Sequence, residues 1–167
     1  MNCRNCGASM RFVWDRDYFL CEYCKTCDFP EEGPDSFRIV DERSGLPCPA
    51  CAAELQVASL LKMRVLHCGN CRGFLMKQDR FRILVSNLRA RATEPPVIPE
   101  PIDPKELLRQ VRCPHCRQVM ETHVYGGPGN VIVDNCPRCT VIWMDYGELK
   151  KIRDAPGRDR RMGPSVE

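Results

Sequence analysis

The sequence predicts a small, metal-bound α+β protein made of three tandem modules, and three observations support this fold class. Thirteen cysteines occur among the 167 residues. Twelve of them form six Cys-x-x-Cys pairs, which follow one another in three blocks. Each block is too short to bury a hydrophobic core worth more than about 3–5 kcal/mol, so it needs a cross-link to stay folded.

The spacing within each block predicts that the cross-link is a metal ion. The two pairs of a block are separated by 14, 16 and 19 residues, and the last two gaps fall in the range typical of zinc sites. Between the pairs, apolar and β-branched runs flank turn residues, which predicts a hairpin with one pair at each end. Four thiolates then converge at about 2.3 Å on one tetrahedral Zn²⁺, as in a zinc ribbon. We therefore expect three zinc ions per chain. The predicted ligands are Cys3, Cys6, Cys21, Cys24, Cys48, Cys51, Cys68, Cys71, Cys113, Cys116, Cys136 and Cys139.

The first module, residues 1–30, fits the pattern least closely. Its hairpin consists of MRFVW, a DRD turn and YFL. Because Cys24 also forms a Cys-x-x-Cys pair with Cys27, the sequence leaves the ligand set open. The apolar run directly before Cys21 favours Cys21 with Cys24, and Cys27 is then an incidental residue, a spare ligand or a redox-sensitive thiol. The acidic segment that follows, residues 31–46, is interpreted as a linker.

The second module, residues 47–92, adds a helix to its ribbon. ELQVA and RVL form the predicted hairpin, and a third strand follows the last cysteine of the block. Apolar residues then recur at intervals of three and four, which predicts a helix from about Asp79 to Arg91. Its apolar face would pack on the hairpin and enlarge the core. That face consists of Phe81, Leu84, Val85 and Leu88.

A proline-rich linker, residues 93–103, leads to the third module, residues 104–156. Asp103 as a cap and Pro104 as the first helical residue predict a short helix just before the first cysteine of this module. The hairpin of its ribbon is expected from QVMETHVY and VIVD, which flank the turn sequence GGPGN.

The third module is also predicted to end in a helix. Asp145 as N-cap and Glu148 three residues later form a capping box, and Pro156 would end the helix. The remaining residues, 157–167, are expected to form a disordered tail.

The motifs of the third module resemble those of a known family. It contains Cys-Pro-His-Cys at residues 113–116, Cys-Pro-Arg-Cys at residues 136–139 and Ile-Trp-Met-Asp-Tyr-Gly-Glu-Leu at residues 142–149. This combination resembles the bacterial TFIIB-type zinc-finger domain family over roughly residues 113–155. The resemblance implies zinc bound by the four cysteines and, through the name of the family, a link with transcription.

The second module resembles a degenerate copy of the same motif. It keeps the glycine of the family at Gly73, but Leu75 replaces the tryptophan and Lys77 replaces the aspartate. The third module itself departs from the family by having Val141 where that glycine is common.

The charge distribution leaves nucleic-acid binding open as an alternative function. The formal net charge is +3, and three Zn²⁺ ions with four thiolates each would bring it to about −3, so overall charge does not predict a nucleic-acid partner. The second module alone is basic. An ordinary solvated helix face explains its arginines better, because no aromatic residues interleave with them. The candidate phosphate contacts are Arg80, Arg82, Arg89 and Arg91.

Four-thiolate sites argue against catalysis. They leave no open coordination position for a water molecule, so we expect no enzymatic activity and no small-molecule substrate. Iron held as in rubredoxin uses the same donors, which keeps an electron-transfer protein as an alternative. A thiol-redox protein is also an alternative, although the Cys-x-x-Cys pairs do not begin helices in a βαβ context.

The expected function is therefore that of an interaction module that docks on a protein assembly. The sequence begins without a signal peptide and contains no apolar segment of the length of a membrane helix. We expect a cytoplasmic protein, in which closely spaced cysteines hold metal more often than they form disulfides.

Overall fold

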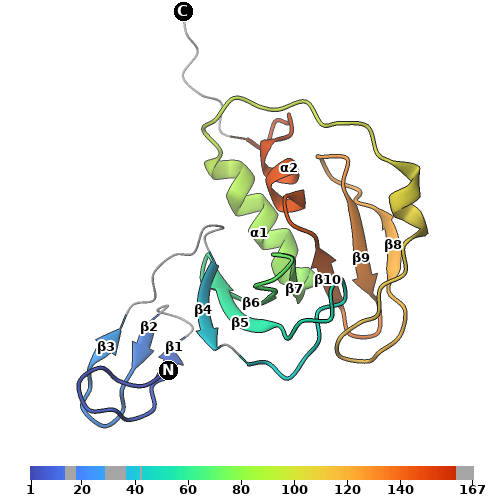
Figure 1. Cartoon of the computed structure of the whole chain (residues 1–167). Coiled ribbons are helices and arrows are strands. Elements are labelled where there is room, and N and C mark those ends of the chain that lie inside the picture. The colour runs from blue at the N-terminus through green and yellow to red at the C-terminus, as the bar shows by residue number, and fades with distance from the viewer. Residues whose placement is uncertain (14–17, 29–36, 42, 161–167) are drawn as a thin grey trace, which may run out of the picture.

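The computed structural model describes residues 1–13, 18–28, 37–41 and 43–160. Within this part of the chain there are a three-stranded sheet, a seven-stranded sheet and two α-helices (Figure 1). This agrees with the predicted small α+β class. The predicted DRD turn and the last residues of the predicted tail lie outside the described residues.

The first ribbon forms the three-stranded sheet and lies at one end of the molecule (Figure 1). Its antiparallel strands are β1 (Arg11–Val13), β2 (Tyr18–Leu20) and β3 (Cys27–Asp28). Phe12 and Phe19 face each other across the hairpin, with ring centroids 5.0 Å apart. They form a small core with the buried cysteines of this ribbon.

The seven-stranded sheet combines the second and third ribbons in one antiparallel layer. Strand β4 lies in the segment interpreted from sequence as a linker, which corrects that interpretation. The segment folds onto the sheet because Phe37 is buried in the core against Phe74. In order across the sheet, the strands are β4 (Phe37–Asp41), β5 (Gln56–Leu60), β6 (Met63–His67), β7 (Phe74–Lys77), β10 (Val141–Met144), β9 (Ile132–Cys136) and β8 (Glu121–Val124).

The two ribbons meet through their third strands in a nearly symmetric way. Leu75 of β7 pairs directly with Trp143 of β10. These residues hold the same position in their modules, each four residues after the last cysteine, Cys71 or Cys139. An antiparallel pair with equivalent residues opposite each other implies an approximate twofold axis, as in a symmetric dimer interface. The packing between these two ribbons, which the sequence left open, is therefore the centre of the fold.

A glycine allows this close approach. A Cβ at Gly73 would lie 2.3 Å from Cζ2 of Trp143 and 2.9 Å from the carbonyl oxygen of Met144. Neither group can move cheaply, since one is a fully buried ring and the other is backbone. The position therefore requires glycine for packing.

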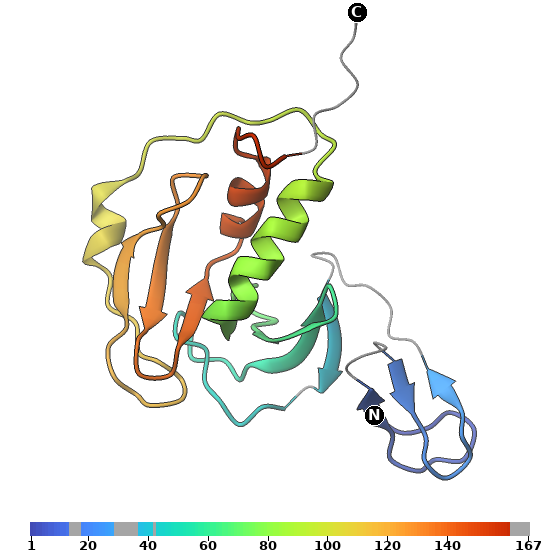
Figure 2. The ribbon, with the colours of Figure 1, turned by 180° about the vertical axis from the view of Figure 1, so that it is seen from behind.

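Both helices pack on the same face of the seven-stranded sheet (Figures 1 and 2). Helix α1 (Gln78–Arg91) confirms the predicted periodicity, because Phe81, Leu84 and Val85 are buried in the core. Helix α2 (Glu148–Asp154) contributes Ile152 to the same core and packs against α1. Among the described residues, no helix has the length and apolarity needed to cross a membrane.

The beginnings of the two short helical segments differ in how well the sequence predicted them. Asp103 caps the 3₁₀ helix at residues 104–108, and its carboxylate accepts a hydrogen bond from the Lys105 amide, as expected. The predicted N-cap of α2 is wrong, because Gly147, with φ of 87°, holds that position. Half of the capping box survives, since the Asp145 amide donates to the Glu148 carboxylate over 2.8 Å.

The described part of the predicted tail is ordered. Arg89 of α1 reaches across to α2 and donates to the carbonyl oxygens of Ile152 and Ala155. It also forms a two-pronged ion pair with Asp159, at 2.5 and 2.6 Å. Arg160 donates to the Asp154 carbonyl. Asp159 and Arg160 are therefore held to the helix pair by these polar contacts, which corrects the predicted start of the tail.

Candidate metal centres

The twelve predicted ligands form three separate clusters. In each, the four sulfur atoms lie within 4.8 Å of one another. The clusters are Cys3, Cys6, Cys21 and Cys24; Cys48, Cys51, Cys68 and Cys71; and Cys113, Cys116, Cys136 and Cys139.

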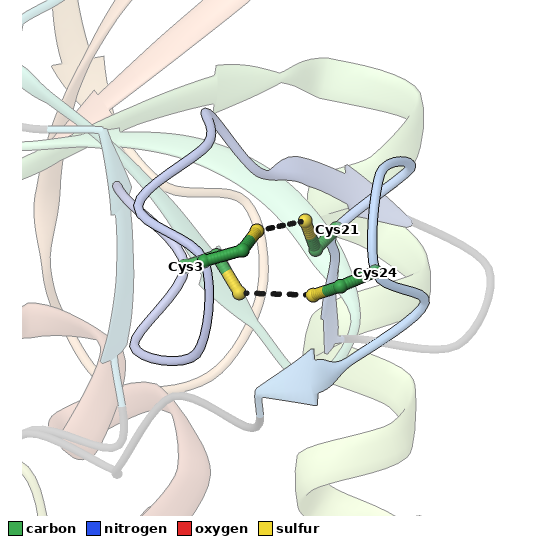
Figure 3. Close-up of side chains that lie close together, drawn as sticks. Cys3, Cys21 and Cys24 are labelled. Atoms are coloured by element: carbon green, nitrogen blue, oxygen red, sulfur yellow. Dashed lines mark hydrogen bonds between the residues drawn. The ribbon is translucent and has the colours of Figure 1, made fainter.

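The sulfur separations fit a tetrahedral ion. In the first cluster, the sulfurs of Cys3 and Cys24 lie 3.4 Å apart and those of Cys6 and Cys21 lie 3.5 Å apart (Figure 3). Across the third cluster, Cys116 and Cys136 are separated by 3.6 Å. A Zn²⁺ ion bound at about 2.3 Å by four thiolates places its sulfurs about 3.8 Å apart. Each cluster is therefore already close to the size that the ion needs.

The structure also decides which cysteine pair closes the first cluster. Cys21 and Cys24 belong to it, as the apolar run before Cys21 suggested. Cys27 is exposed in strand β3, with its sulfur 4.0 Å from the Lys25 carbonyl oxygen. It takes no part in the cluster.

All six Cys-x-x-Cys pairs adopt one backbone conformation. The residue directly after each pair has a left-handed conformation, with φ between 52° and 75°. Its amide donates to the carbonyl of the first cysteine of the pair in five of the six pairs, as Gly7 does to Cys3 and Ala52 to Cys48, both over 2.9 Å. This tight turn directs both sulfurs toward the same point. The six residues are Gly7, Lys25, Ala52, Arg72, Arg117 and Thr140.

One thiol in each cluster is acidic enough to ionise first. A hydrogen bond from the Thr26 hydroxyl group lowers the pKa of Cys24 to about 5. The side chain of Asn70 lowers the pKa of Cys51 to about 6, and a backbone amide lowers that of Cys116 to about 7. Each cluster thus starts with one thiolate near neutral pH.

The other thiols need a cation before they ionise. Burial raises the pKa of Cys71 to about 11, and burial together with the neighbouring sulfurs raises the pKa of Cys139 to about 12. Four negative sulfurs at these distances repel one another strongly unless a positive ion lies between them. The chemistry of the clusters therefore favours a bound divalent metal, with all four donors supplied by the chain.

A charged network that sequence reasoning missed lies in the third ribbon. Arg109, in the segment before the ribbon, contacts the buried Asp134 of β9 at 2.8 Å and also pairs with Asp145. The Asp145 carboxylate accepts a hydrogen bond from the Trp143 indole over 2.9 Å, so it orients this core residue instead of capping α2. A signal was present in the sequence, since Asp134 is a charged residue within the apolar run VIVD.

The four candidate nucleic-acid residues do not share one environment. Arg80, Arg82 and Arg91 are exposed on α1. Arg89 is only 1% exposed and is held by Asp159 and the end of α2. It stabilises the helix pair and cannot reach a phosphate, so its proposed role is wrong.

A comparison with known protein families finds a match for the third ribbon. Residues 112–155 match the family model described as the transcription factor zinc-finger of the TFIIB zinc ribbon. With its four-cysteine cluster, this segment is a zinc-binding ribbon of the TFIIB type. The match covers the third ribbon, whereas the first two are zinc-ribbon-like by their clusters and hairpins. No curated protein and no solved structure matches the chain.

Proposed function

We propose that this protein is a non-enzymatic docking module in which three zinc ions maintain a rigid surface for a partner protein. The observation that carries this proposal is the closed donor set of all three clusters, each with four sulfurs from the chain. A metal held in this way stabilises a fold and offers no position for a reacting group. The description of the matched family supports a transcription assembly as the setting.

The arrangement of the second and third ribbons supports a docking role. Their sheets are continuous, and the helices cover only one face. Two metal clusters therefore brace a single broad body, which presents backbone edges at β4 and β8 and side chains on the other face of the sheet. A rigid surface of this kind loses little conformational entropy when a partner binds.

Native mass spectrometry combined with metal analysis tests the proposal. We expect three zinc ions per chain, and the loss of one ion from a Cys113→Ser/Cys116→Ser variant. Two zinc ions in the unaltered protein would mean that the first cluster does not close. Iron in place of zinc, seen as a coloured protein, would contradict the proposal in favour of electron transfer.

Nucleic-acid binding is a second candidate, favoured by the exposed cations of the second ribbon and α1. A salt series on duplex DNA and on RNA tests it. Affinity that falls steeply with salt and disappears when Arg82 and Arg91 are changed to Glu would support this candidate. Weak binding that these changes do not alter would contradict it.

A further inference from the structure

The face of the large sheet that lies opposite the helices carries a continuous row of side chains. Val57, Leu66, Leu75 and Trp143 are directly paired in turn across four neighbouring strands, so all four lie on this face. The alternate residues, such as Ala58 and Phe74, belong to the core beneath the helices.

The two halves of this row are covered differently. Trp143 is fully buried, and beyond it in the row Asp134 is 1% exposed under Arg109. The segment before the third ribbon therefore covers that half. Leu66 holds the equivalent position in the second ribbon, since it pairs with Leu75 as Asp134 pairs with Trp143. It is only half-buried.

A groove with a volume of about 1000 Å³ lies over this open half. The aliphatic residues of its lining are Leu46 and Leu66, which are partly exposed, and Val57, Leu75 and Val141, which are buried. Met63 also lines it, although this partly buried residue packs against the core beneath the helices.

Positive charge surrounds the groove. Its cations come from the segment before the second ribbon, the β5–β6 turn, β6, β7 and α1, so their convergence arises from the fold. Among the described residues that line the groove, Asp41 is the sole acidic one. The basic lining residues are Arg43, Lys62, Arg64, Lys77, Arg80 and His115.

We propose that this groove binds an acidic peptide segment of a partner protein, with apolar side chains on the aliphatic floor and carboxylates against the basic rim. This inference rests on the proposed docking function and specifies its partner. In the third ribbon, the position equivalent to Leu66 is already covered, because Arg109 of the same chain lies over the acidic Asp134. In the second ribbon the equivalent position holds the apolar Leu66 among basic side chains, which suits a cover that is both apolar and acidic.

The lining favours a peptide over a nucleic acid. Among the described residues, no phenylalanine, tyrosine or tryptophan lines this groove, whereas single-stranded nucleic acids bind largely by stacking bases on aromatic rings. An aliphatic floor adds nothing to the binding of a phosphate backbone. It does add affinity for leucine or phenylalanine side chains between the carboxylates.

Fluorescence anisotropy with the full zinc-loaded chain tests the proposal. The probe is a labelled peptide of twelve residues in which Asp and Glu alternate with Leu and Phe. A second peptide has Ser in place of each Leu and Phe, and a twelve-nucleotide DNA strand serves as the third ligand. We expect the first peptide to bind at least tenfold more tightly than either of the others.

A pair of charge reversals at the rim of the groove, one in the β5–β6 turn and one on α1, locates the binding. Lys62→Glu combined with Arg80→Glu should weaken binding of the first peptide at least tenfold. Arg82→Glu combined with Arg91→Glu is the control with the same change in charge, because both residues are exposed on α1 and neither lines the groove. It should change the affinity less than twofold. Equal weakening by both changes would overturn the proposal.

Other outcomes also give a clear answer. Equal affinity for the Ser peptide would show that charge alone acts, and tighter binding of the DNA strand would assign the groove to nucleic acid; either result overturns the proposal. Nuclear magnetic resonance of the unaltered protein should show peptide-induced chemical-shift changes in β5, β6 and β7 and none in β8. This measurement needs no variant, so it does not depend on whether a variant folds. Absence of those shifts in a protein with three zinc ions rejects the groove but not the docking function.

Discussion

The first ribbon and the fused pair of ribbons hold the same four-sulfur clusters, but the protein around the clusters differs. Behind the first cluster, the buried side chains other than cysteine are, among the described residues, those of Met10, Phe12 and Phe19. Behind the other two, a seven-stranded sheet and two helices share one core. One metal site can therefore hold together a module that has almost no hydrophobic core. Another metal site of the same kind stabilises a module that also has a large core of its own.

The largest expected effect comes from removing clusters one at a time. Cys3→Ser with Cys6→Ser should cost one zinc ion and unfold the first ribbon, since zinc contributes about 10–16 kcal/mol in such small sites. Amide hydrogen exchange should show unchanged protection in β5 to β7 and in α1. A loss of protection throughout the fused pair would show that the first ribbon is part of the same folding unit.

Cys113→Ser with Cys116→Ser provides the other half of this test. The third cluster lies at one end of β9 and beside the seam of the two ribbons, that is, the paired strands β7 and β10. Its loss should remove the main thermal transition, because the metal contribution is comparable with the whole stability of a domain, about 5–15 kcal/mol. A melting temperature like that of the unaltered protein would contradict the view that the two ribbons share one fold.

The next effect concerns the seam itself. Gly73→Ala places a methyl group 2.3 Å from the Trp143 ring, and we expect it to lower the free energy of unfolding of the fused pair by about 3 kcal/mol. Urea denaturation followed by tryptophan fluorescence would measure this loss. Gly126→Ala is the control, because nothing lies within 4 Å of a Cβ there. Equal stability of the two variants would exclude close packing at the seam.

This seam also shows where prediction from sequence ended. The clusters, the hairpins and α1 follow from local patterns, namely cysteine spacing, turn residues and apolar periodicity. The pairing of Leu75 with Trp143 depends on two strands that are far apart in the chain, and no local pattern records that partnership. In the sequence Gly73 stands out only as a family feature, whereas its physical role is the space it leaves for Trp143.

Local sequence patterns likewise do not predict which charged residues are buried. Arg89 lies on the predicted helix with three other arginines, and composition gave no reason to separate it from them. Only the folded helix pair shows that it is buried against Asp159 and the end of α2. Arg109 and Asp134 likewise form a pair across separate segments of the third module.

Arg89→Met should therefore destabilise the fused pair and leave the first ribbon unchanged. The variant keeps much of the side-chain volume but leaves the carbonyls of Ile152 and Ala155 without this donor, which we expect to cost about 2–3 kcal/mol. Thermal unfolding measures the loss, with Arg82→Met as the exposed control on α1. If both variants melt at the same temperature, Arg89 does not clamp the two helices.

The buried Glu148 makes the fused pair sensitive to pH. Burial raises the pKa of this carboxyl group from 4.5 to about 8. The folded protein then holds the proton at pH values where the unfolded chain releases it, so the contribution to stability is full below pH 4.5 and is lost as the pH rises toward 8. This loss is at most about 1.4 kcal/mol per pH unit.

Glu148→Gln tests this directly. The amide keeps an acceptor for the Asp145 backbone but cannot ionise. Denaturation of both proteins with excess zinc between pH 6 and 8 should show a stability difference that grows in favour of the variant as the pH rises. Taking the difference removes the pH dependence of zinc binding itself. A difference that stays constant with pH would exclude ionisation of Glu148 in this range.

The smallest expected effect is on zinc affinity and concerns the backbone turns that follow the Cys-x-x-Cys pairs. Ala52 holds a left-handed conformation with φ of 64°, where an L-residue costs about 1 kcal/mol, while the first ribbon has Gly7 at the equivalent place, with φ of 75°. Ala52→Gly should stabilise the second cluster, and Gly7→Ala should weaken the first, each by about 0.5–1 kcal/mol after the entropy of glycine in the unfolded chain is included. Competition with a calibrated chelator would measure both changes as opposite shifts in zinc affinity. Shifts of the same sign would mean that the thiolate–metal bonds, and not the backbone of the turn, set the relative strength of the clusters.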